Sequence, residues 1–335
     1  MMHPAEPSLR WGDLSLEGSA RWNDVDTVAS RWLGRACLAV PSVRVGLCWT
    51  LEVAGLRRHR SHVLVPRFVG RCILNAIGRV ALPVEVPTPD TQAAIVVDQY
   101  GLRQDLPALV PEFTQRGWAY VEDSPYGVGS DEPPGHGSLG RFIGLAKVLP
   151  ISQGALLVTE RADVAAEIRR RREEWSAWSL PVWLTMTILR FRREVGSYAA
   201  AADAAYEMYG AARGGNRWLR GNIRTVLGRA DAHETESARR LALIGEQLAS
   251  AALMPDLSRL GYVVPFRIED DEPAVGAIFR ACGFDAGAYH VDEARNLLSP
   301  AFSRCMLIPL NPRIPREAFD RLVVTLASRV KERAA

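Results

Sequence analysis

Short apolar runs alternate with amphipathic stretches of helical period between residues 35 and 160, and this alternation limits the folds open to the chain. The apolar runs cover residues 37–40, 62–66, 82–86, 93–98 and 119–123. Such runs are typical of strands buried on both faces of a sheet, and the helices between them make successive strands parallel. The pattern predicts a doubly wound α/β sheet. Ligands bind such a sheet at the carboxyl ends of its strands. Two of the predicted strands end at Asp98 and Asp123, so these positions are where a ligand site is expected.

The remainder of the chain has a different character. Residues 161–250 carry long helical patterns, and residues 255–335 follow the order strand, helix, strand, helix. These four elements are expected at residues 262–268, 272–281, 305–310 and 315–329. The sequence therefore predicts two domains, a large one over residues 1–230 and a small C-terminal α+β domain over residues 231–335.

Composition argues against several classes of function. A net charge of +3 over 335 residues gives no electrostatic footprint for nucleic acid, and the longest uncharged apolar run, residues 178–189, is too short to span a bilayer. The N-terminus lacks the pattern of an export signal, and the five cysteines are scattered without metal-ligand spacing. We therefore expect a cytoplasmic protein that binds no nucleic acid, no membrane and no metal.

Lysine is almost missing from the basic residues. The chain has 41 lysines and arginines, and only Lys147 and Lys331 are lysines. Lys331 lies in the polar C-terminal tail, whereas Lys147 lies in the apolar segment 142–150. Arginine cannot replace lysine where an amine must lose its proton and attack a carbonyl, which favours a chemical role for Lys147. Coincidence, or a lysine that extends from a strand end toward water, remains the alternative.

A carboxylate and an aromatic residue are expected near this lysine. Asp123 closes one predicted strand, and Phe68 follows another. An amine, a carboxylate and an aromatic face together suit pyridoxal 5'-phosphate, because the amine holds its aldehyde, the carboxylate keeps its pyridine nitrogen protonated and the aromatic side chain stacks on its ring. Taken singly, Asp123 is more typical of a turn and Phe68 of a core position.

Several motifs occur in a characteristic order along the chain. They lie at residues 65–84, 97–101, 121–124, 137–147, 154–159, 221–224 and 306–312. In order and spacing they resemble the DegT/DnrJ/EryC1/StrS aminotransferases, and the resemblance runs from about residue 32 to residue 329. It implies a fold-type-I pyridoxal-phosphate transferase fold, with a large domain built on a mostly parallel sheet and a small C-terminal α+β domain.

The resemblance also implies a role for individual residues. Lys147 would be the Schiff-base lysine, Asp123 would lie at the pyridine nitrogen, and Phe68 would stack on the ring. Asn222, in a turn at residues 221–224, would reach the cofactor phosphate of a neighbouring subunit. This last role implies a homodimer.

The family's phosphate-binding turn corresponds to residues 42–47, where this chain departs from the pattern. Ser42 is kept, but Val43 and Arg44 replace a glycine and a threonine, and small residues are what let a helix N-terminus approach a phosphate closely. Arg44 could grip the phosphate through its guanidinium group instead. Tyr126 stands where the family has a glutamine, and Phe142 where it has a serine.

The function that the resemblance implies is amino-group transfer from glutamate or glutamine to a keto sugar nucleotide or a related small keto compound, in a biosynthetic pathway. One alternative is another pyridoxal-phosphate reaction, such as elimination or dehydration, because a fold does not determine a reaction. Tyr126 and the altered neighbourhood of Lys147 would suit a changed substrate. The other alternative is a cofactor-free regulatory or partner subunit, which the changes at Val43, Arg44 and Phe142 would suit.

Overall fold

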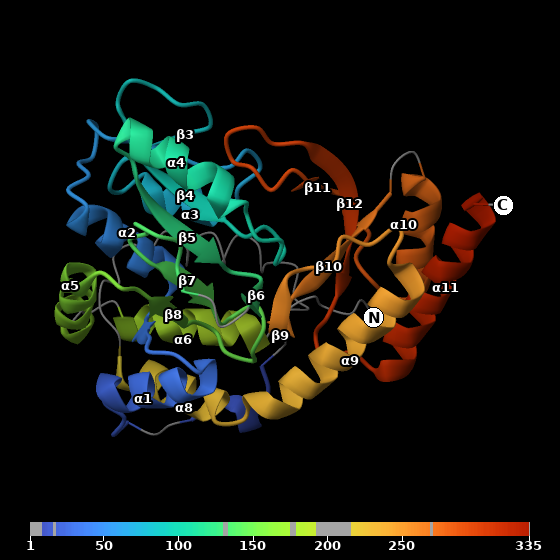
Figure 1. The fold of residues 1–335 in the computed structure, drawn as a ribbon. Coiled ribbons are helices and arrows are strands. Elements are labelled where there is room, and N and C mark those ends of the chain that lie inside the picture. The colour runs from blue at the N-terminus through green and yellow to red at the C-terminus, as the bar shows by residue number, and fades with distance from the viewer. Residues whose placement is uncertain are drawn as a thin grey trace.

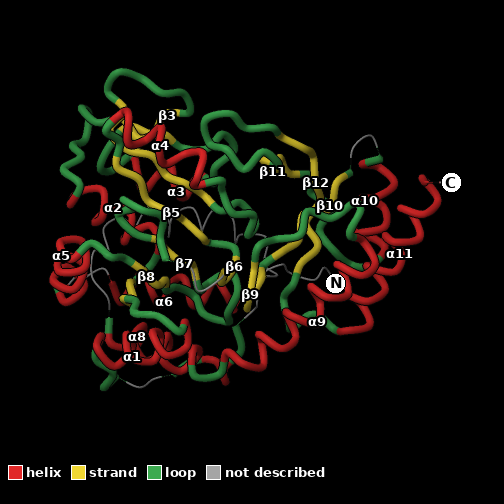
Figure 2. The backbone as a smooth tube through the Cα atoms, in the orientation of Figure 1, coloured by secondary structure: helices red, strands yellow, loops and turns green. Residues whose placement is uncertain are grey.

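A computed structural model describes residues 9–15, 18–129, 133–174, 179–191, 216–268 and 271–334. A central sheet flanked by helices forms one part of the molecule, and a smaller sheet backed by long helices forms the other (Figure 1). Figure 2 shows the strands of the central sheet lying between helices. No helix within the described ranges combines the length and the hydropathy needed to cross a lipid bilayer.

The central sheet has seven strands in the order β1-β8-β7-β5-β4-β2-β3. Its strands are β1 Leu38–Val40, β2 His62–Leu64, β3 Leu82–Val84, β4 Thr91–Val97, β5 Ala119–Ser124, β7 Arg141–Gly144 and β8 Ala155–Val158. Strands β3, β2, β4, β5 and β7 run parallel, whereas β8 pairs antiparallel with both β7 and β1. The mostly parallel sheet predicted from the apolar runs is confirmed.

Helices cover both faces of this sheet because its strands are apolar on both faces. Along β4, Ala93 and Ile95 pack on one side with helices α2, α3 and α5, while Ala94 and Val96 pack on the other with α4. The helices of this part, with one short 3-10 turn, are η1 Trp11–Asp13, α1 Trp22–Leu33, α2 Val43–Val53, α3 Arg71–Ile77, α4 Leu106–Arg116, α5 Ala162–Glu173, α6 Ser179–Phe191 and α8 Arg217–Leu227.

The C-terminal part is built on a three-stranded antiparallel sheet in the order β10-β12-β11. Its elements are α9 Ala230–Leu248, β10 Val263–Arg267, α10 Glu272–Ala281, β11 Tyr289–Asp292, β12 Phe302–Pro309 and α11 Arg316–Ala334. A separate core drawn from residues 244–327 packs the helices, β10 and β12 together, while Val291 of β11 packs in a smaller cluster with Cys305 of β12. The domain boundary expected after residue 230 falls at the start of α9 and stays a prediction.

A two-stranded ladder, which sequence analysis did not anticipate, joins the two parts. Strand β6, Gly127–Gly129, pairs antiparallel with β9, Leu257–Gly261. This pairing brings the segment that follows β5 against the segment that precedes β10, so side chains from both parts of the chain can meet beyond the end of β5.

Candidate functional site

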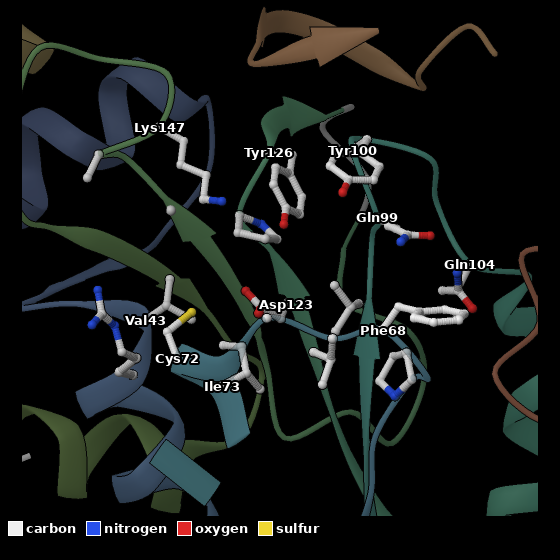
Figure 3. Close-up of a pocket in the computed structure, with 18 of the residues that line it drawn as sticks. Val43, Phe68, Cys72, Ile73, Gln99, Tyr100, Gln104, Asp123, Tyr126 and Lys147 are labelled. Carbon is white, nitrogen blue, oxygen red and sulfur yellow. The ribbon is translucent and has the colours of Figure 1, made fainter. Parts of the chain in front are cut away.

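A pocket opens at the edge of the central sheet where the parallel strands end (Figure 3). The segments that follow β1, β2, β4, β5 and β7 contribute its walls, and Asp292, Leu297, Pro300 and Phe302 of the C-terminal part complete them. Six of the seven site residues predicted from the sequence line this one pocket: Ser42, Arg44, Phe68, Asp123, Tyr126 and Lys147. The seventh, Asn222, does not belong to it.

Asp123 is a buried carboxylate at the base of the pocket. Its side chain is 0% exposed, and neither carboxylate oxygen accepts a hydrogen bond from any described residue. Burial, together with the neighbouring carboxylate of Asp98, raises the pKa of Asp123 to about 7, against the opposing charge of Lys147. A buried carboxylate that lacks a donor is costly, so this position is suited to a ligand that brings an N–H group.

Asp98 lies beside Asp123, because Val97 of β4 pairs with Asp123 of β5 in parallel register. The Ser124 hydroxyl donates a hydrogen bond to Asp98, and the Gln104 backbone N–H donates a second at 3.3 Å. Burial raises the pKa of Asp98 to about 6, and the Ser124 hydrogen bond and the charge of Arg141 work against that rise. Donors stabilise the ionised form of Asp98 but not of Asp123, so the pKa of Asp123 is raised further than that of Asp98.

Lys147 lies in the turn between β7 and β8, and tyrosine rings surround its amine. The Lys147 Nζ atom is 4.1 Å from the centroid of the Tyr126 ring and 5.2 Å from that of Tyr262. Tyr100 packs against Tyr126 with the two ring centroids 4.8 Å apart. Such contacts stabilise a cation by about 0.5–2 kcal/mol and fix the direction of the side chain. Sequence analysis placed Tyr126 here but missed Tyr262, which reaches the site through the β6–β9 ladder.

Phe68 follows β2 in a left-handed backbone conformation, with a φ of 63°. Its ring is 48% exposed and stacks on His290, with the centroids 4.3 Å apart and the planes at 10°. Phe302 packs edge-on against the same ring at 5.1 Å. In Figure 3, Phe68 lies on the Gln104 side of the pocket and Lys147 on the opposite side. The stacking role expected for Phe68 stays a prediction, and one face of the ring already stacks on His290.

The N-terminus of helix α2 forms another wall of the pocket. Ser42 is its N-cap, and the Val45 backbone N–H donates to the Ser42 hydroxyl at 3.3 Å. Val43 and Arg44 are the first two residues of the helix, and both line the pocket. The site thus contains a guanidinium group and the positive end of a helix dipole.

Asn222 lies outside the pocket, and its expected contact with the phosphate of a neighbouring subunit stays a prediction. It lies within helix α8 and not in a turn, so the turn predicted at residues 221–224 is wrong. Its amide group exchanges hydrogen bonds with the Ser15 backbone at 3.0 and 2.9 Å and donates to the Trp218 carbonyl at 2.7 Å. The side chain, 2% exposed, anchors the N-terminal segment to α8, and we leave it out of the candidate site.

Phe142 is a core residue and does not line the pocket. Its side chain is 0% exposed, and a Cβ atom added to Gly46 of α2 would lie 2.2 Å from its ring. The ring therefore packs beneath the helix, at a point where α2 must have a glycine. Phe142 therefore contributes to core packing and does not obstruct the pocket.

Gln99 holds the C-terminal sheet against the pocket. Its Nε2 donates to the His290 carbonyl at 2.7 Å, and its Oε1 accepts from the Asp292 backbone N–H at 2.9 Å. Replacing Gln99 with alanine removes both hydrogen bonds, so we expect the free energy of unfolding to fall by about 1–3 kcal/mol in urea titrations. Gln115→Ala, on the exposed face of α4, is the matched control and should change nothing measurable. Equal stability of the two variants would contradict this role.

Among the described residues, no group of three or more histidine, cysteine, aspartate or glutamate side chains could hold a metal ion. The charged and phenolic side chains of the pocket are instead one amine, two carboxylates, two guanidinium groups and two phenols: Lys147, Asp123, Asp292, Arg44, Arg67, Tyr100 and Tyr126. These groups suit the binding of an organic cofactor or substrate that has both an N–H donor and an anionic end.

Comparison of whole structures shows which known proteins share this architecture. The aminotransferase TlmJ from Streptoalloteichus hindustanus is 17% identical, with a TM-score of 0.64 over 100% of both chains. DesI, solved in the presence of its TDP-sugar product, is 17% identical, with a TM-score of 0.61 over 99% of this chain and 94% of its own. NtdA from Bacillus subtilis, solved with its bound cofactor PMP, is 15% identical, with a TM-score of 0.54 over 92% of this chain and 77% of its own.

No protein-family model and no curated protein sequence matches the chain. The structural likeness extends over nearly the full length of this chain, through the central sheet and the C-terminal part alike. The expected fold is thereby confirmed: the chain has the fold of the fold-type-I aminotransferases, with a mostly parallel sheet flanked by helices.

Proposed function

We propose that this protein is a pyridoxal-phosphate-dependent aminotransferase acting on a keto sugar nucleotide or a related small keto compound in a biosynthetic pathway. The observation that carries the proposal is the pocket shared by Asp123, a buried carboxylate that accepts no hydrogen bond from the described chain, and Lys147, the only lysine outside the C-terminal tail. Burying such a carboxylate is costly, and a pyridine N–H group would offset that cost.

The pocket residues fit this cofactor in chemical type. Asp123 would accept a hydrogen bond from the ring nitrogen, and Lys147 would hold the cofactor through its amine and then carry protons as a general acid and base. Tyr126 would keep Lys147 aligned, since the Lys147 amine already lies over its ring. Ser42 and Arg44 would bind the phosphate at the N-terminus of α2. When bound, the cofactor supplies an electron sink that lets the substrate exchange a proton.

The substrate class rests on the structural neighbours. DesI was solved with a TDP-sugar product, and the Helicobacter pylori protein PseC is an aminotransferase involved in the biosynthesis of pseudoaminic acid. We propose glutamate or glutamine as the amino donor of this chain, and a homodimer in the cytoplasm as its working state. Asp123 argues against the cofactor-free alternative, because a subunit that never binds a cofactor gains nothing from this buried group.

The test uses the scarcity of lysine. In a Lys331→Arg background Lys147 is the only lysine, so pyridoxal phosphate is added, the complex is reduced with borohydride, and the labelled peptide is identified by mass spectrometry. The expected result is a visible absorbance band that reduction removes, with one label on Lys147. Transfer of the amino group from glutamate to a keto sugar nucleotide then tests the reaction itself. The absence of band and label at saturating cofactor would overturn the proposal.

A further inference from the structure

Gln153 is a buried amide for which sequence analysis gave no role. Its side chain is 5% exposed and lines the pocket, and its Nε2 donates to no acceptor in the part of the chain that the structure describes. An amide N–H₂ group buried without an acceptor is unfavourable, unless a ligand provides that acceptor.

Strand pairing places Gln153 beside the N-terminus of α2. Strand β8 runs antiparallel to β1, and Val40 pairs with Ala155. Two residues beyond this pair on each strand, Ser42 and Gln153 reach the same edge of the sheet. Ser42 is the N-cap of α2, and Ser42 and Gln153 line the same pocket, into which the positive end of that helix opens.

Side-chain alternation indicates which way Gln153 points. Ala155 and Leu157 of β8 pack into the core that includes α2, and Gln153 is in phase with them along the chain. Gly154 is out of phase, and a Cβ atom added to it would meet Ile223 of α8 on the opposite face, at 3.1 Å. Gln153 therefore projects on the α2 side of the sheet, where Arg44 also lines the pocket.

We propose that Gln153 and Arg44 together bind a phosphate monoester at the N-terminus of α2, with Gln153 donating a hydrogen bond through Nε2. In this chain, long side chains would thus bind the phosphate, whereas a glycine-containing turn would bind it through backbone N–H groups. The inference rests on the proposed function and deepens it. The groups gathered here are donors: an amide, a guanidinium group and helix N–H groups, with no acidic residue in the first turn of α2. Such a set selects an oxyanion.

The experiment compares ligands with and without the phosphate. Dissociation constants of pyridoxal phosphate and of pyridoxal are measured by equilibrium dialysis for wild type, Gln153→Met and the exposed control Gln115→Met. Methionine keeps the length of the side chain but removes its donors. Loss of one hydrogen bond to a charged group should weaken pyridoxal phosphate roughly tenfold to a hundredfold, while pyridoxal changes less than twofold. Gln115→Met should bind both ligands as wild type does.

Equal weakening of both ligands, or of neither, would overturn the inference. Should Gln153→Met fail to fold, Gln153→Glu serves in its place, because its carboxylate repels phosphate and should weaken pyridoxal phosphate even more. Inorganic phosphate separates this inference from the proposed function. A phosphate-dependent rise in melting temperature that Gln153→Met abolishes supports the subsite, even if no cofactor attaches to Lys147. If phosphate does not raise the melting temperature of the wild-type protein, the phosphate subsite is contradicted while the proposed function is not.

Discussion

Replacing Lys147 with arginine is expected to abolish amino-group transfer without disturbing the fold. Arginine keeps the positive charge and can still lie over the Tyr126 ring, but its guanidinium group does not lose a proton near neutral pH. It can therefore neither attack an aldehyde nor shuttle protons. Loss of general acid–base catalysis alone costs about 10²–10⁴ in rate, and loss of the covalent attachment adds to it.

This prediction is measured as the rate of a single turnover with glutamate, followed by absorbance in the presence of saturating cofactor. Lys331→Arg makes the same chemical change in the exposed last turn of α11, and it should react as wild type does. Melting temperatures of both variants check the fold. A Lys147→Arg rate within tenfold of wild type would mean that Lys147 is not the reacting amine.

Replacing Asp123 with asparagine is expected to stabilise the cofactor-free protein at alkaline pH while it destroys cofactor binding. The pKa of Asp123 is about 7 in the folded protein and near its ordinary value of 3.8 when unfolded, so the folded state binds the extra proton between these two values. The free energy of unfolding therefore falls as pH rises from about 4 to 7 and then levels off. Asparagine resembles the protonated acid, so the variant should not lose stability as the pH rises.

The expected gain for Asp123→Asn is about 2–4 kcal/mol at pH 8, and it should vanish near pH 4. Urea unfolding at a series of pH values measures it. Asp163→Asn is the control: this exposed carboxyl pairs with Arg161, which holds the pKa of Asp163 below its usual range, so its variant should gain nothing as pH rises. A gain for Asp123→Asn that is independent of pH would show that Asp98 and burial do not hold a proton on Asp123.

Much of the fold could be predicted because local chemistry and global packing agree. Helix α4, between two of the predicted strands, has clear local signals at both ends: Asp105 caps its start with a side-chain hydrogen bond from Ala108, and Gly117 ends it in a left-handed conformation. The parallel strands β4 and β5 were visible as apolar runs because helices bury both of their faces. Where the capping residues, the apolar pattern and the packing of an element all agree, a single sequence is enough to predict that element.

The wrong prediction of a turn arose where a short sequence motif conflicted with the helical spacing of apolar residues. Asn222 was assigned to a turn on the strength of a short motif, although Leu219, Ile223 and Val226 recur at helical spacing around it and Asn216 caps the helix. The periodic pattern was the stronger physical signal, since it describes a face that must be buried.

Other site residues could not be found without strand register. Gln153 reaches α2 through the antiparallel pairing of β8 with β1, and Tyr262 reaches Lys147 through the ladder between β6 and β9. Neither pairing can be deduced from the spacing of residues along the chain. The sequence offered one signal for Gln153, which is its position next to an apolar strand. Gln153 is a polar residue two places before such a strand, just as Asp98 is a polar residue directly after one.

The β6–β9 ladder also has a consequence for biosynthesis. Tyr262 and the pocket residues Asp292, Leu297, Pro300 and Phe302 come from the last quarter of the chain, while the other walls come from its first half. A ribosome that has translated only the central sheet carries a nascent chain with Lys147 and Asp123 but without these walls. If the proposed function holds, the complete pocket becomes available to a cofactor only after the C-terminal part has been translated and has folded against the central sheet.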